Sequence, residues 1–130
     1  MARKMSGASV LVLGMMLCFS ACGGLQQPVV VDAKLSHVVE VKVSDFAFEP
    51  NNLQVHEGDT IDFKLQNVSS RDHNFTLEDP DGKTLQDVAI PAGKTVDVKV
   101  SFLGTGTYRF HCSIDLHSAM GMKGQVVVSK

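Results

Sequence analysis

The segment Tyr108-Arg-Phe-His-Cys-Ser-Ile-Asp-Leu-His-Ser-Ala-Met-Gly-Met-Lys-Gly124 is the most informative stretch of the chain. Its first residues alternate between apolar and polar, so Tyr108 and Cys112 share one face of a predicted strand. His117 follows Cys112 after four residues, and Met122 follows after four more. A thiol, an imidazole and a thioether are therefore expected in one loop between two strands.

Alternating apolar and polar residues also dominate the sequence upstream of this segment. Short alternating runs separated by turn residues predict an all-β antiparallel sandwich or barrel of about eight strands. No helix is expected, except at most a short one over residues 116–120. The predicted strands lie at residues 39–43, 53–55, 61–65, 75–77, 85–90, 96–100, 108–112 and 125–128.

Length and charge narrow the classes of function. The 130 residues suffice for one domain, and the formal net charge is −2. A phosphate-binding surface needs an excess of basic residues, so nucleic acid is not an expected partner. The chain has no Trp and one Tyr, which also disfavours stacking on bases.

The N-terminus has the layout of an export signal. Arg3 and Lys4 precede the apolar run 10–19, which is too short to span a bilayer comfortably. The sequence Phe19-Ser20-Ala21-Cys22 resembles a bacterial lipoprotein signal box, although Phe stands where Leu is usual. We predict a signal peptide over residues 1–21 and a lipid on Cys22 that anchors an exported protein to a membrane. Ordinary cleavage and release is the alternative.

The rest of the chain divides into a linker and a domain. Gly, Gln and Pro follow Cys22, so residues 22–36 are predicted to be a flexible tether. The folded domain is expected over residues 37–130. Cys112 is then its only thiol, and a lone thiol in an oxidising compartment needs protection or a role, which metal coordination would supply.

The residue types point to copper. Sulfur ligands favour Cu(I), imidazoles accept both oxidation states, and two His with one Cys and a distant Met form a blue-copper site. His73 begins a strand after a polar loop and is the candidate for the second imidazole. Zinc could also bind these groups. In the metal-free alternative, His73 is a surface residue and Cys112 and Met122 are packing residues.

The chain resembles the cupredoxin family, which includes plastocyanin, azurin, auracyanin and rusticyanin. The resemblance covers nearly all of residues 37–130. It rests on the motifs Phe48-Glu-Pro, Leu53-x-Val-x-x-Gly-Asp59, His73-Asn74, Tyr108-x-Phe-x-Cys112, Cys-x₄-His-x₄-Met and Gly121-Met-Lys-Gly124.

This resemblance implies a Greek-key sandwich and one copper ion. It implies that His73 and His117 bind through ring nitrogen, Cys112 as thiolate and Met122 as the long axial ligand. Asn74 would tie the His73 loop to the Cys112 loop and donate a backbone hydrogen bond to the sulfur.

The ligand loop departs from the family pattern in two ways. Asp115 and Leu116 stand where Pro is common before the second His. Met120 also lies in the loop and is an alternative axial ligand. If Met122 is the ligand, Leu116 and Met120 are expected to form an electron-transfer surface around His117. His111 could provide a second route, or could simply be an outward strand residue.

We expect an electron carrier rather than an enzyme, because four protein ligands leave no open position for a substrate. Its partners would be redox proteins, and the carrier itself is expected to be a monomer. A periplasmic protein that binds or delivers copper is the main alternative, because the same ligands would serve it.

Overall fold

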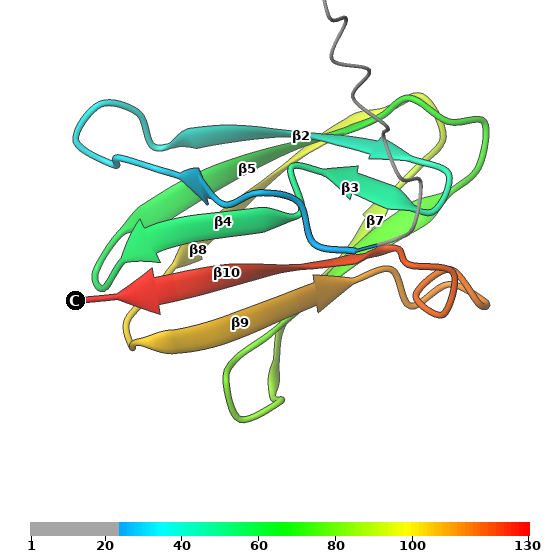
Figure 1. Ribbon diagram of the computed structural model, residues 1–130. Helices are drawn as coiled ribbons and strands as arrows, with labels where there is room; N and C mark the ends of the chain where they lie inside the picture. The colour runs from blue at the N-terminus through cyan, green and yellow to red at the C-terminus, as the bar shows by residue number, and fades with distance from the viewer. Residues whose placement is uncertain (1–23) are drawn as a thin grey trace, which may run out of the picture.

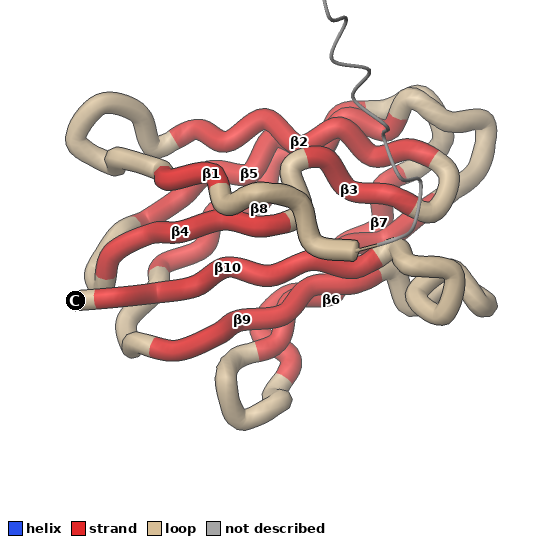
Figure 2. Tube along the Cα trace, in the orientation of Figure 1, coloured by secondary structure: helices blue, strands red, loops and turns tan. Residues whose placement is uncertain are grey.

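The computed structural model describes residues 24–130, which form two β-sheets packed face to face (Figures 1 and 2). The first sheet has six strands in the order β1-β4-β10-β9-β6-β7, and the second has four in the order β3-β2-β5-β8. The strands are β1 (Val29–Val30), β2 (Val38–Ser44), β3 (Ala47–Glu49), β4 (Asn52–His56), β5 (Thr60–Asn67), β6 (His73–Glu78), β7 (Thr84–Ile90), β8 (Thr95–Ser101), β9 (Gly106–His111) and β10 (Lys123–Ser129).

The all-β prediction is confirmed, and all eight predicted strands are present as β2 and β4 to β10. The predicted antiparallel arrangement holds for only part of each sheet, because both sheets are mixed. Strands β1 and β10 both run parallel to β4, and β2 runs parallel to β5. Period-two alternation reports which face of a strand is buried and carries no information about direction, so the sequence could not distinguish the mixed sheets.

The short helix considered for residues 116–120 is absent. In this region the backbone makes a single turn, with the Met120 amide donating to the Leu116 carbonyl at 3.0 Å. Asp115, just before it, has a positive φ of 47°. Such a conformation lies outside the right-handed helical region and helps to confine the loop to a turn.

Aromatic side chains fill the space between the sheets. Phe48 of β3 contacts the rings of Phe75 and Phe110 edge to face, with centroids 6.0 and 5.3 Å apart. All three rings are at most 1% exposed. Since β3 belongs to one sheet and β6 and β9 to the other, these contacts fix the strands that carry the ligands.

The segment before β2 differs from the predicted flexible tether. Val29 and Val30 pair with β4, and the Val31 amide donates to the Gln54 carbonyl at 2.9 Å. The side chains of Val31 and Ala33 are largely buried at 8% exposure. Consecutive valines favour a paired strand over a solvated linker, and this preference outweighs the Gly- and Gln-rich start of the segment.

The predicted signal peptide and Cys22 lie outside residues 24–130. Among the described residues, no helix is long and apolar enough to cross a bilayer.

Candidate metal centre

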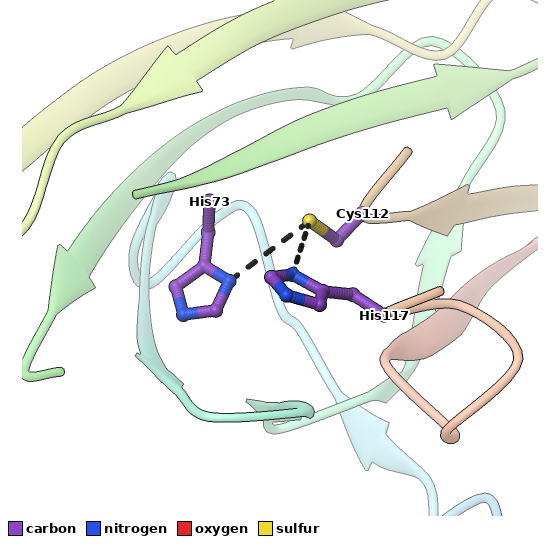
Figure 3. A group of neighbouring side chains, drawn as sticks. All are labelled: His73, Cys112 and His117. Carbon is purple, nitrogen blue, oxygen red and sulfur yellow. Dashed lines mark hydrogen bonds between the residues drawn. The ribbon is translucent and has the colours of Figure 1, made fainter. Parts of the chain in front are cut away.

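Three predicted ligands converge at one end of the sandwich (Figure 3). His73 is the first residue of β6, Cys112 directly follows β9, and His117 lies in the loop to β10. The Cys112 sulfur lies 3.5 Å from Nδ1 of His117 and 3.9 Å from Nδ1 of His73. The two imidazole centroids are 5.1 Å apart. Each Nδ1 thus points towards the sulfur, as a shared metal ion requires.

The cluster is almost completely removed from water. Cys112 is 0% exposed, His73 1% and His117 7%. A buried thiol alone packs as a small hydrophobe, but the imidazole nitrogens that face it are polar and need a hydrogen-bond partner or a metal. One soft sulfur and two imidazole nitrogens suit copper, so the residues present fit the ion that the family resemblance implies.

The two candidate axial methionines occupy different environments. Met122 is 0% exposed and Met120 is 58% exposed. The Met122 amide donates to the His117 carbonyl at 3.0 Å, and its carbonyl accepts from the Cys112 amide at 3.1 Å. The backbone of Met122 is therefore tied to two other predicted ligands, whereas the Met120 side chain faces solvent.

The Asn74 side chain joins the His73 strand to the residue after Cys112. Its Oδ1 accepts from the Ser113 amide at 2.7 Å, and its Nδ2 is 2.6 Å from the Ser113 hydroxyl. Nδ2 also approaches Asp87 Oδ1 at 2.9 Å and the Thr76 hydroxyl at 3.2 Å. The expected tie between the two loops is thus present. The hydrogen bond from the Asn74 backbone to the sulfur stays a prediction.

The far side of the His73 ring has partners that sequence reasoning missed. Its Nε2 lies 3.0 Å from the Ser69 hydroxyl and 3.5 Å from Asp45 Oδ1. Asn67 fixes Ser69, because Asn67 Oδ1 accepts from both the Ser69 amide and the Ser69 hydroxyl. These contacts orient the ring so that Nδ1 faces Cys112. No regular spacing relates these residues to His73, so the sequence offers no signal for them.

Burial lowers the pKa of His73, and the neighbouring His117 lowers it further, while the Asp45 carboxylate acts in the opposite direction. Both lowering effects disfavour the imidazolium form. The neutral ring is the form that binds a metal, so the environment prepares His73 for that role.

The predicted electron-transfer surface is partly exposed. Leu116 and Met120 are 72% and 58% exposed and lie in the same loop as His117. Phe46, which has a positive φ of 63°, places its ring edge to face against His117 with centroids 5.2 Å apart. His111 is half-buried in β9. Phe46 thus covers one side of His117, and the electron-transfer surface of Leu116, Met120 and His111 stays a prediction.

Fold and site together define a β-sandwich protein with a buried Cys–His₂ cluster. A family model described as "Cupredoxin-like domain" matches residues 9–128. Plastocyanin of Vicia faba is 37% identical over 93 residues, which cover 64% of this chain and 88% of the relative. The chain belongs to the cupredoxin family, the blue copper proteins, and the cofactor of that family is the single copper ion that the resemblance implied.

Solved structures agree on the fold. Reduced auracyanin from the photosynthetic bacterium Roseiflexus castenholzii superposes with a TM-score of 0.65 at 20% identity, over 73% of this chain and 98% of that one. A multicopper oxidase of Staphylococcus aureus is 29% identical over 98 residues, but the match covers only 22% of that enzyme. The prediction that the chain is not an enzyme agrees with these comparisons. The chain matches most of plastocyanin and of auracyanin, but only a small part of the oxidase.

Proposed function

We propose that this chain is a type 1 copper protein that carries single electrons between redox proteins outside the cytoplasm. The observation that carries the proposal is the buried convergence of the Cys112 sulfur on Nδ1 of both His73 and His117. A copper ion at this point would supply reversible one-electron exchange.

Each ligand has a stated part in this proposal. Nδ1 of His73 and of His117 and the Cys112 thiolate would hold the ion, and the Met122 thioether would be the distant fourth ligand. The ligands come from the start of β6 and from the loop between β9 and β10. Backbone hydrogen bonds brace this loop, and Asn74 ties it to β6. A rigid and water-free surrounding of this kind limits rearrangement when the charge of the site changes.

The surface beside His117 suits a brief contact with a partner protein. Leu116 and Met120 offer exposed apolar side chains, and Asp115 adds a negative charge beside them. Weak electron-transfer encounters bury little surface, so a small patch is sufficient for such a contact. We infer that partners dock here, with His111 as a second contact point, and that the carrier acts as a monomer.

We also infer export and anchoring. The N-terminal pattern supports a signal peptide over residues 1–21 and a lipid on Cys22, with the protein on an extracytoplasmic membrane face. Mass spectrometry of the protein isolated from a membrane fraction tests both inferences, since a lipidated chain begins at Cys22 and is heavier by the attached acyl groups.

A second function, copper binding or delivery, has one specific observation in its favour. A copper-resistant cuproprotein, CopI of Rubrivivax gelatinosus, is 28% identical over 113 residues, which cover 74% of this chain and 68% of the relative. A copper donor should lose Cu(I) readily to a competing metal-free protein. An electron carrier should keep its copper through many cycles of oxidation and reduction.

Visible and EPR spectra of the copper-loaded protein test the main proposal. We expect an intense thiolate-to-copper absorption band with narrow copper hyperfine splitting, and loss of the band in Cys112→Ser. Replacing Met122 with Leu should shift the potential and keep the colour, whereas Met120→Leu serves as the matched control. A potential shift in the Met120 variant alone would assign the axial position to Met120.

A further inference from the structure

The first described residues are held by two buried asparagines. Asn51 donates through Nδ2 to the Gly24 carbonyl at 3.2 Å and accepts through Oδ1 from the Gln26 amide at 2.7 Å. Asn52 donates to the Gln26 carbonyl at 2.9 Å and accepts from Gln125 Nε2 at 3.2 Å. Asn51 and Asn52 are only 9% and 7% exposed. Residues 24–31, which include β1, are called the strap below.

The asparagine contacts lie at the metal end of the sandwich. The Asn51 carbonyl accepts from the Gln125 amide at 2.9 Å, near the start of β10. Met122 is three residues earlier, so it lies roughly 10 Å along the strand direction from this contact. Figure 1 shows the start of the described chain near the loop before β10, whereas the C-terminus lies at the opposite end.

The strap determines where an attachment before Gly24 leaves the domain. Cys22 is two residues from Gly24, a reach of about 7 Å at most. A flexible tether over 22–36 would have allowed the domain to turn freely and to reach far from the membrane. With Gly24 and Gln26 fixed beside Asn51, an anchor at Cys22 is confined to the end of the molecule that carries the metal site.

Four exposed apolar side chains lie at the same end, while Leu35 and Leu103 are exposed elsewhere on the domain. Leu25 of the strap is 52% exposed, and Val68 of the loop between β5 and β6 is 51% exposed. Leu116 and Met120 are exposed in the loop that carries His117. Such side chains suit the boundary of a lipid surface or of a membrane-embedded protein.

We propose that the strap keeps the metal end of the anchored protein at the bilayer surface, so that its redox partner is a protein of the same membrane. This inference rests on the proposed electron-carrier function and on lipidation of Cys22. The docked strap itself depends on neither and is tested separately.

Hydrogen exchange of the isolated protein tests the strap. We expect the Gln26 and Val31 amides to exchange about two- to tenfold more slowly than an unstructured segment, because each donates one hydrogen bond. Gln26→Pro removes the amide that donates to Asn51, lies outside every strand, and should speed exchange over residues 24–31 alone. Lys34→Ala, an exposed change nearby, is the control. Unprotected exchange over 24–31 in the unmodified protein would overturn the proposal, whatever the copper content.

The position of the metal end is tested in vesicles of phosphatidylglycerol and phosphatidylcholine that contain a nitroxide-headgroup lipid. Oxidised, copper-loaded protein should enhance nitroxide relaxation, and the reduced protein is the diamagnetic control. Insertion of about ten Gly-Ser residues between Gly23 and Gly24 adds a reach of roughly 17 Å and should cut the enhancement by about tenfold or more. Equal enhancement with and without the insertion would contradict the proposal. Absence of a type 1 EPR signal would instead contradict the proposed function and leave the exchange result to decide the strap.

Discussion

Replacement of Asn74 by Ala should loosen the connection between the two ligand-bearing loops. The side chain is 8% exposed and holds both the amide and the hydroxyl of Ser113. A neutral hydrogen bond contributes about 0.5–1.5 kcal/mol and one to a carboxylate about 1.5–3 kcal/mol. Asp87 is exposed, so the smaller value applies to its bond, and Asn74→Ala should lower the free energy of unfolding by about 2–3 kcal/mol.

Urea unfolding of the copper-free protein measures this loss. Ser113→Ala removes one partner and keeps the bond from the Ser113 amide, so it should cost about 1 kcal/mol. Lys64→Ala changes an exposed residue and should stay within about 0.5 kcal/mol of the unmodified protein. The slope of free energy against urea should be unchanged. If Asn74→Ala matches the Lys64 variant, Asn74 does not hold the loops together.

Three other outcomes follow from the structure. Ser69→Ala removes the hydroxyl 3.0 Å from Nε2 of His73 and should weaken copper binding about 10- to 100-fold in a chelator competition, whereas the exposed neighbour change Ser70→Ala should not. Gly124→Ala places a Cβ 2.5 Å from a backbone oxygen and should destabilise the protein by about 1–3 kcal/mol in urea, while Gly104→Ala, whose nearest contact is 3.8 Å, should cost less. Because burial lowers the pKa of His73, the unfolded chain binds more protons below about pH 6.5, so urea unfolding of the copper-free protein should show stability falling as the pH drops from that value. A pH-independent stability in this window would contradict the buried neutral imidazole.

The sequence predicted the strands well because each exposes one face to the core. Valines at alternate positions of β2 and β8 leave a clear period of two, and the structure has both strands at those residues. The ligand loop was also predictable, since Cys112, His117 and Met122 lie close together in the chain.

Contacts between distant segments were not predictable in the same way. The parallel pairing of β10 with β4 joins residues more than seventy positions apart, and nothing in either strand records the direction of its neighbour. Ser69 and Asp45 reach His73 only because two loops meet at the end of the sandwich. Asn51 and Asn52 resemble ordinary turn residues, yet their side chains bind the strap.

Copper K-edge X-ray absorption of the loaded protein tests the central claim most directly, because it reports the atoms around the ion. We expect one copper per chain with one short sulfur ligand and two imidazole nitrogens, and loss of the short sulfur in Cys112→Ser. A first shell of oxygen and nitrogen alone, or an unchanged shell in the Cys112 variant, would contradict a copper ion shared by Cys112, His73 and His117.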